Sequence, residues 1–373
     1  MFKFDFPIAE STNHNYDFEG MRQNNHTFQI NGRDVSAHAP PYIIGEIAQA
    51  HDGSLGTAHA YIDALADAGA DAVKFQTHIA DQESSNKEKW RVKFSNQDRT
   101  RLDYWRRMEF TPDQWANLKS HVEKRGLTFL SSPFSKAAVD LLDKIGMPAW
   151  KVASGEVNNE CLMEHILAAR KPILLSSGMS TLHELDCAVE RIKNANCQYA
   201  VLQCTSNYPV KPSALGLNLI DEFALRFDCP VGLSDHSGTI YPSLGAITLG
   251  ASIIEIHVTF HKKMFGPDIE SSVTINEFAQ IVQGARLLYE ARRTPVDKDF
   301  NASQLREMRS NFQQSLIVTS DLTRGSKLTK ENLDTRKPCV GIPADEFLAT
   351  IGRKVNKEIN AGEFITHSDL ESI

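Results

Sequence analysis

The chain lacks the long apolar segments that place proteins in or across membranes. No apolar run approaches the roughly 18 residues of a membrane-spanning helix, and the first 30 residues are polar, without the hydrophobic stretch of a secretory signal. We therefore expect a cytoplasmic protein. The 40 basic and 47 acidic residues are spread along the chain, which indicates neither a nucleic-acid-binding stripe nor a polybasic membrane patch. A small-molecule partner is the remaining expectation.

Cysteine is also scarce. The six cysteines include no Cys-x-x-Cys pair, and most lie in apolar segments, so we expect reduced, buried thiols. Cys204 ends an apolar run, and packing is its expected role. What is present is ordinary for a globular protein: 373 residues, 41% hydrophobic and 23% charged, enough for one large domain and a small one.

Two short segments each close an apolar run with an imidazole. One run ends at Asp235 and is followed by His236, and the other contains Glu255 and His257. Both runs have the composition of buried strands, and the small-residue helical pattern between them predicts parallel pairing. Adjacent strand ends would let the two histidines share a transition metal, with a neighbouring carboxylate or water completing the ligand shell. The alternative is that each histidine is a structural hydrogen-bonding residue.

Eight apolar runs of strand length alternate with helical segments. The expected strands cover residues 41–47, 71–77, 127–132, 150–154, 172–177, 198–205, 230–235 and 253–259. The expected helices between them include residues 56–68, 112–125, 136–145, 160–169, 181–194 and 217–227. Eight βα alternations predict an α/β fold, a (β/α)8 TIM barrel, and in such barrels the chemistry lies at the carboxyl ends of the strands.

Ionisable and hydroxyl side chains gather at these predicted strand ends. They include Glu46, Lys74, Gln76, Ser132, Lys151, Ser154, Ser176, Ser234 and Glu255. Two ammonium groups among several hydroxyl donors suit a phosphate or carboxylate anion. Capping of a strand would explain any single serine, but it does not explain the whole set.

The pattern changes after the barrel. Short strand-like runs alternate with turns at Gly325 and Gly362, and the two halves of this tail echo each other. About 60 residues make a marginal core, so we expect the tail to lean on the barrel or on a second subunit. The expected divisions are an N-terminal arm (1–40), the barrel (41–292), a linker or bridging helix (293–311) and a small β-rich domain (312–373).

The strand-end motifs, in this order and spacing, resemble those of the sialic acid (N-acetylneuraminate) synthases and their legionaminic and pseudaminic acid relatives. The resemblance covers residues 40–373, and the tail is similar to the small antifreeze-like (SAF) domain. The motifs are Gly45-Glu46-Ile47, the stretches 71–77 and 151–156, Ser132-Pro133-Phe134-Ser135, Ser176-Ser177-Gly178-Met179, the stretch 204–209, the two histidine segments and Gly266-Pro267-Asp268.

The resemblance implies condensation of phosphoenolpyruvate with an open-chain N-acyl hexosamine, which releases phosphate and gives a nine-carbon 2-keto acid. It implies a divalent metal, Mn²⁺ or Mg²⁺, on His236 and His257, and a domain-swapped homodimer. Glu46 and Glu255 would be the acid-base carboxylates, with Lys74 and Lys151 also catalytic. Phosphoenolpyruvate would bind Lys74, Lys151, Ser132, Ser154, Ser176 and Ser234, and the sugar would bind Gln76, Tyr208, Asp268 and a second subunit's Arg336 or Lys337.

The chain departs from the family pattern on the sugar side. Ala50 stands where asparagine is usual, Ser206 stands where some members have asparagine, and Lys337-Pro338-Cys339 replaces Arg-Pro-Gly. The sequence therefore leaves the acceptor sugar unidentified. Two other functions stay open: a related barrel synthase of the keto-deoxy-octulosonate type, which acts on a sugar phosphate, and a non-catalytic sugar-binding homologue.

Overall fold

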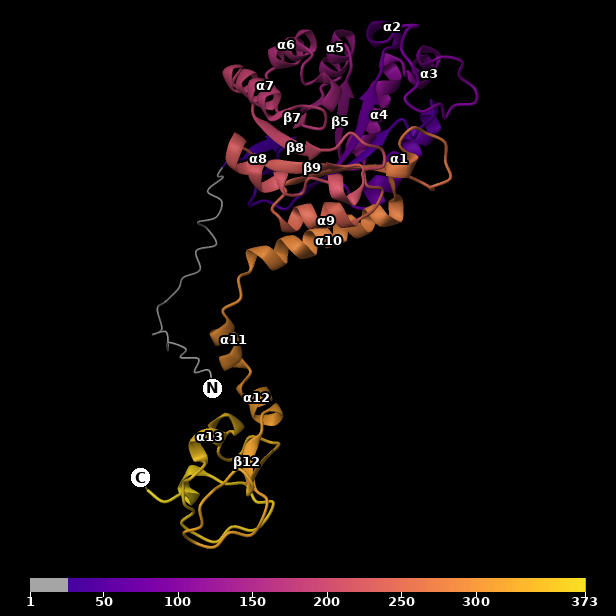
Figure 1. Ribbon diagram of the computed structural model, residues 1–373. Helices are drawn as coiled ribbons and strands as arrows, with labels where there is room; N and C mark the ends of the chain where they lie inside the picture. The colour runs from indigo at the N-terminus through magenta and orange to yellow at the C-terminus, as the bar shows by residue number, and fades with distance from the viewer. Residues whose placement is uncertain (1–25, 373) are drawn as a thin grey trace. The chain divides into compact units, whose positions relative to one another are not determined.

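The computed structural model describes residues 26–372, which form two compact units (Figure 1). The barrel unit ends at Arg293, and the tail unit begins at Thr294. Residues 1–25 of the expected N-terminal arm lie outside the described residues.

The barrel unit is built on eight parallel strands. They are β3 (Tyr42–Ala48), β4 (Ala72–Thr77), β5 (Thr128–Pro133), β6 (Trp150–Val152), β7 (Ile173–Ser176), β8 (Tyr199–Cys204), β9 (Val231–Asp235) and β10 (Ile253–Thr259). Strand β10 pairs with both β9 and β3, so the last strand joins the first. Strands β5 and β6 are neighbours in space without a hydrogen-bonded ladder between them. The predicted (β/α)8 barrel is confirmed, with every strand within two residues of its expected limits.

Helices follow the strands and cover the outside of the barrel (Figure 1). They are α1 (Leu55–Asp67), α4 (Pro112–Lys124), α5 (Lys136–Lys144), α6 (Glu160–Ala168), α7 (Leu182–Asn194), α8 (Leu219–Phe227), α9 (Tyr241–Thr248) and α10 (Ile275–Arg293). Side chains of Ser54, Thr111, Ser135 and Thr181 accept a hydrogen bond from the first turn of α1, α4, α5 and α7. Such caps satisfy amide groups that the helix leaves free. Helix α10, after the short strand β11 (Val273–Thr274), is not among the expected helices.

A hairpin closes the amino-terminal end of the barrel. Its strands are β1 (Phe28–Ile30) and β2 (Arg33–Val35), which pair antiparallel. Phe28, Ile30 and Val35 are buried in one cluster with Tyr42 and Ile253, the first residues of β3 and β10. Residues 28–35, within the expected N-terminal arm, thus belong to the core of the barrel unit.

The interior of the barrel changes from apolar to polar at one height. Successive side chains on a strand point to opposite faces, so residues two apart share the interior. Buried Ile44 is followed at that spacing by Glu46, and buried Leu174 by Ser176. An apolar floor therefore lies beneath a polar layer at the carboxyl ends of the strands.

A long insertion separates β4 from α4. It contains α2 (Ala80–Glu83), an irregular stretch of residues 84–100, which we call the mouth segment, and α3 (Arg101–Met108). The insertion has its own apolar cluster, in which Trp90 and Phe94 pack against buried residues of α2 and α3. Arg107 anchors it by contacts of 2.7 Å to both Asp98 and Asp52.

The tail unit consists of short elements around a compact core. They are α11 (Lys298–Gln304), α12 (Arg306–Phe312), β12 (Ser315–Val318), β13 (Leu333–Arg336) and α13 (Phe347–Thr350). Strands β12 and β13 pair antiparallel. Gly325 and Gly362 have φ of 86° and 87°, the left-handed conformation that the two predicted turns require of glycine. The stretch expected as a linker or bridging helix carries two short helices.

None of the six cysteines, all of which lie within residues 26–372, forms a disulfide. Cys197, Cys204 and Cys229 are buried as expected, but the prediction is wrong for Cys161 and Cys187, which are exposed on α6 and α7. Within residues 26–372 no helix has both the length and the apolar character needed to cross a membrane.

Candidate active site

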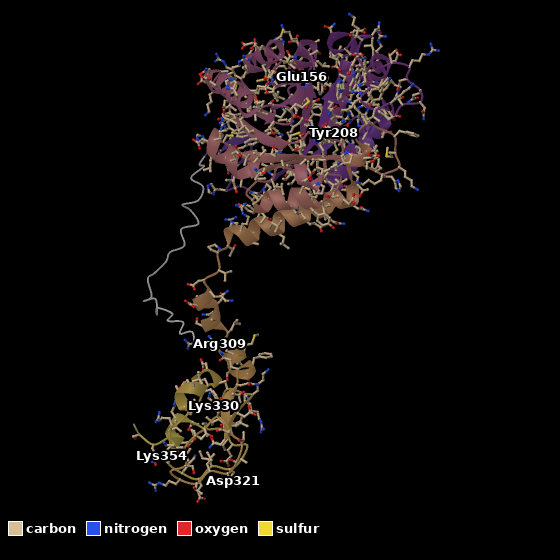
Figure 2. All side chains as sticks on the ribbon, viewed as in Figure 1. Glu156, Tyr208, Arg309, Asp321, Lys330 and Lys354 are labelled. Atoms are coloured by element: carbon tan, nitrogen blue, oxygen red, sulfur yellow. The ribbon has the colours of Figure 1, made fainter. Side chains whose placement is uncertain are left out.

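A cleft of about 510 Å³ opens at the carboxyl ends of the barrel strands. Glu156 and Tyr208, two of its lining residues, are labelled in Figure 2. The structure brings together in this cleft all the site residues predicted within the barrel: Glu46, Lys74, Gln76, Ser132, Lys151, Ser154, Ser176, Tyr208, Ser234, His236, Glu255, His257 and Asp268. Arg336 and Lys337 belong to the tail unit, where both are exposed.

Two lysines and two glutamates form the buried floor of the cleft. Lys74 is paired with Glu46 and lies 3.9 Å from Glu255, and Lys151 lies 3.5 Å from Glu255. These side chains are 6% exposed or less, so water solvates their charges poorly. Each charge is therefore stabilised mainly by the opposite charges beside it. The four formal charges cancel.

The two carboxyl groups of the floor differ in acidity. Burial raises the pKa of Glu46 to about 7, against the opposing effect of Lys74. Burial also acts to raise the pKa of Glu255, but Lys151 and Lys74 outweigh it, and the net pKa is lowered. Carboxyl groups whose pKa values are pushed apart are suited to different roles, one exchanging a proton near neutral pH and one staying ionised.

Hydroxyl groups surround the lysines. Lys74 Nζ donates to Ser132 Oγ at 3.2 Å, and Lys151 Nζ donates to Ser176 Oγ at 2.5 Å. Ser234 Oγ donates to Glu255 at 3.0 Å. Ammonium and hydroxyl donors at this spacing match the oxygen atoms of a phosphate or carboxylate.

Some polar atoms of the floor have no hydrogen-bond partner within the described residues. Among the described residues, Oε1 of Glu46 and Oε2 of Glu255 are buried and accept no hydrogen bond. Buried polar atoms are normally paired, so each exception calls for a reason. Both residues line the cleft, and a bound hydroxyl group or water would supply the missing donor.

The two histidines lie side by side, with ring centroids 5.3 Å apart. His236 Nδ1 lies 3.0 Å from the carbonyl oxygen of Thr205, which leaves Nε2 as its ligating atom. Burial lowers the pKa of His257 well below the usual value, and a neutral imidazole is the form that binds metal. Burial also acts to lower the pKa of His236, but its contact with Cys204 outweighs this and the net pKa is raised, so a metal on His236 competes with a proton. The pair therefore fits a metal that takes its other ligands from water or substrate.

Among the described residues, no third protein ligand completes that pair. Within residues 26–372 no group of three or more His, Cys, Asp or Glu side chains has the arrangement of a metal site. Asp235, expected beside the histidines, instead accepts from Ser243 of α9 at 2.9 Å. The reason is strand alternation: Ser234 faces the cleft, so its neighbour on β9 faces the helices.

The three barrel residues that were predicted to bind the sugar, Gln76, Tyr208 and Asp268, lie on the cleft wall. The ring of Tyr208 packs against His236, with centroids 4.2 Å apart. Gln76 accepts a hydrogen bond from Gln49 at 3.2 Å. Burial raises the pKa of Asp268, and the nearby guanidinium of Arg91 opposes this.

The sequence prediction missed part of the cleft wall. The missed residues include His78, Glu83, Glu88, Arg91, Arg101 and Trp105. These six come from the insertion between β4 and α4. A connection of this length is uncommon in compact domains and is often functional. The length of the segment between the predicted strand and helix was therefore the sequence feature that could have pointed to these residues. Cys204, expected to pack, also lines the cleft, with Sγ 3.8 Å from His236 Nδ1.

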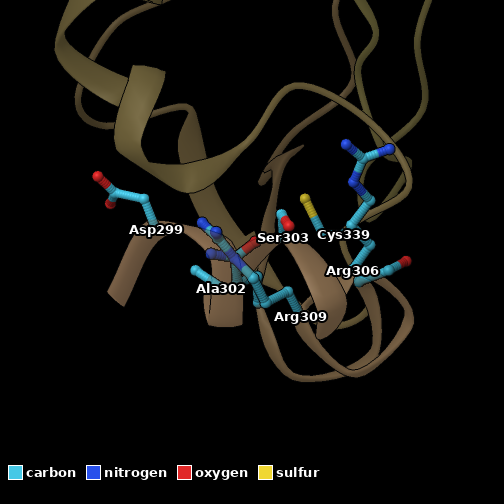
Figure 3. Close-up of a pocket in the computed structure, with 8 residues that line it drawn as sticks. Asp299, Ala302, Ser303, Arg306, Arg309 and Cys339 are labelled. Carbon is cyan, nitrogen blue, oxygen red and sulfur yellow. The ribbon is translucent and has the colours of Figure 1, made fainter. Parts of the chain in front are cut away.

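A second cavity, of about 470 Å³, lies in the tail unit (Figure 3). Its lining includes Arg306, Arg309 and Cys339 but none of the predicted site residues. Lys337 lies elsewhere on the tail unit, with its ammonium 5.2 Å from the ring centroid of Phe312.

Comparison with known proteins identifies the family of the chain. The NeuB family model matches residues 61–296, and the SAF domain model matches residues 313–371. The chain belongs to the NeuB family. It is 33% identical to the N,N'-diacetyllegionaminic acid synthase of Campylobacter jejuni, over 85% of this chain and 97% of that protein. It is 31% identical to human N-acetylneuraminate-9-phosphate synthase, over 87% of this chain and 91% of that protein.

A solved structure shows the same fold. The N-acetylneuraminic acid (sialic acid) synthetase of Leptospira borgpetersenii superposes with a TM-score of 0.67 at 26% identity, covering 76% of this chain and 96% of that one. These relatives are named as synthases or as a synthetase, which supports the conclusion that this member of the NeuB family is an enzyme.

Proposed function

We propose that this chain is a nonulosonic acid synthase. It condenses phosphoenolpyruvate with the open-chain aldehyde of an N-acyl hexosamine and yields a nine-carbon 2-keto acid and phosphate. The observation that carries the proposal is the buried floor of Lys74, Lys151, Glu46 and Glu255 beside the paired histidines. Membership of the NeuB family supports it.

Phosphoenolpyruvate binds over this floor. Lys74 and Lys151 supply positive charge, and the hydroxyl groups that already contact them complete the oxygen shell. Preorganised donors in a dry site stabilise charge more strongly than water does. The same donors receive the phosphate as it leaves. The residues assigned to this task are Lys74, Lys151, Ser132, Ser154, Ser176 and Ser234.

The reaction proceeds in three steps. The methylene carbon of phosphoenolpyruvate attacks the aldehyde carbon, whose oxygen takes a proton and becomes a hydroxyl. Water adds to the resulting cationic carbon and gives up a proton. The hydroxyl group of the tetrahedral product gives up its proton as the bond between carbon and the phosphate oxygen breaks, which releases phosphate and leaves the 2-keto acid. Glu46 exchanges protons in these steps, and ionised Glu255 stabilises the cationic carbon.

His236 and His257 would hold a divalent cation, Mn²⁺ or Mg²⁺. When bound, such an ion polarises the aldehyde oxygen and orients water. The residues of the chain orient the acceptor itself, through Gln76, Tyr208 and Asp268.

The proposal includes a homodimer. Helices α11 and α12 and their flanks expose Val296, Phe300, Met308 and Phe312, each at 54–67%. Exposed apolar side chains of this number favour burial against a partner. In the dimer, Arg336 or Lys337 of a second copy reaches the acceptor.

The decisive experiment incubates the pure protein with phosphoenolpyruvate, Mn²⁺ and a panel of acceptors. The panel holds N-acetylmannosamine, its 6-phosphate, 2,4-diacetamido-trideoxyhexoses and arabinose 5-phosphate. Phosphate release that requires an N-acyl hexosamine, with a nine-carbon acid by mass spectrometry, supports the proposal. Release with arabinose 5-phosphate alone would favour the keto-deoxy-octulosonate type, and sugar binding without release would favour a non-catalytic homologue.

A further inference from the structure

Arg91 joins three separate segments at the mouth of the cleft. Its guanidinium carbon lies 4.4 Å from the ring centroid of Tyr208. Its Nη2 donates to Asp268 Oδ1 at 3.2 Å and to the carbonyl oxygen of Pro267 at 3.3 Å. Tyr208 follows β8, Asp268 follows β10, and Arg91 belongs to the mouth segment. One side chain therefore connects the mouth segment to two residues of the acceptor side.

The carboxylate that Arg91 contacts is more buried than Arg91 itself. Arg91 is 45% exposed, whereas Asp268 is 17% exposed. Tyr208 packs in turn on His236. A planar guanidinium contacts an aromatic face and a carboxylate at once, which fixes both orientations.

We propose that Arg91 is a positioning residue that holds Tyr208 and Asp268 in the orientation that receives the acceptor sugar. The effect that we expect on the acceptor KM rests on the proposed function. Its structural basis, the tie between the mouth segment and the cleft wall, is independent of the reaction.

The kinetic test compares Arg91→Ala and Arg91→Lys with the unchanged protein. Loss of both contacts should raise the KM for the acceptor about tenfold in Arg91→Ala, while the KM for phosphoenolpyruvate stays within about twofold because the floor is untouched. Arg91→Lys keeps a charge near Asp268 but loses the planar stacking, so its acceptor KM should be intermediate. Arg99→Ala is the matched control, since exposed Arg99 is in the same segment but does not line the cleft.

A double-mutant cycle tests whether Arg91 acts through Asp268. If it does, Arg91→Ala should raise the acceptor KM less in the Asp268→Ala background, where the ion pair and its hydrogen bond are already absent and only the contacts with Tyr208 and Pro267 remain to be lost. Additive effects would overturn the inference. An equal rise in both KM values, or no change in either, would also overturn it.

Limited chymotrypsin digestion tests the tie without any activity. Phe94 provides a cleavage position in the mouth segment, and Arg91→Ala should speed cleavage there relative to Arg99→Ala. Equal cleavage rates would refute the tie. If the unchanged protein makes no nonulosonic acid with any acceptor, the proposed function fails, while the digestion result still decides the tie.

Discussion

Replacing Glu46 by glutamine should change how the stability of the barrel depends on pH. The pKa of Glu46 is raised from 4.5 to about 7 in the folded protein, mainly by burial. The folded state therefore binds more protons than the unfolded state between these values, so this group costs stability as pH rises from 4.5 to 7 and the cost then stays. Glutamine does not titrate, and the variant escapes this cost.

The magnitude follows from the two pKa values. Integrating the linkage relation between about pH 5 and about pH 8 gives a cost of about 2.5 kcal/mol in the protein with Glu46. Relative to the unchanged protein, Glu46→Gln should thus gain about 2.5 kcal/mol in free energy of unfolding over this range. Comparing the two proteins at both pH values cancels the titration of the groups that do not interact with Glu46.

Urea unfolding followed by tryptophan fluorescence measures this difference. All four tryptophans lie in the barrel unit, so the signal reports that unit alone. Exposed Glu190→Gln controls for the substitution itself. A difference near zero, or one of opposite sign, would refute the assignment of a raised pKa to Glu46. Activity of Glu46→Gln should also lose its titration near pH 7.

Three further predictions concern other parts of the site. A Cβ added at Gly178 would clash most closely with Ser206 Oγ and would also meet Ser154 Oγ at 2.6 Å and Cys204 Sγ at 2.8 Å, so Gly178→Ala should raise the KM values for both the acceptor and phosphoenolpyruvate; steady-state kinetics with neither KM changed would count against a role of this turn in the cleft. His257→Ala should weaken Mn²⁺ binding, measured by electron paramagnetic resonance, at least about tenfold, and unchanged binding would remove this residue from the metal site. Deleting residues 294–373 should raise the acceptor KM more than the phosphoenolpyruvate KM, whereas equal effects would indicate a purely structural tail.

Much of the cleft floor was predictable because it depends on local rules. Buried parallel strands are apolar along their length, so the eight runs stand out, and the polar residues that end them mark the mouth of the barrel. Lys74, Lys151, Glu46 and Glu255 were identified in this way. Their mutual pairing and the divergence of the two carboxyl pKa values depend on distances and burial across the barrel, which no segment specifies alone.

The sequence by itself determined the barrel, the order of its strands and the polar character of their carboxyl ends, because periodicity and turn residues are local. The tertiary structure decided which side chains from distant parts of the chain contact one another. It turned Asp235 toward α9, placed the hairpin of residues 28–35 under the barrel, and brought Arg91 onto Tyr208 and Asp268. These arrangements join residues far apart in the chain, and their energies arise only once the barrel has closed and excluded water.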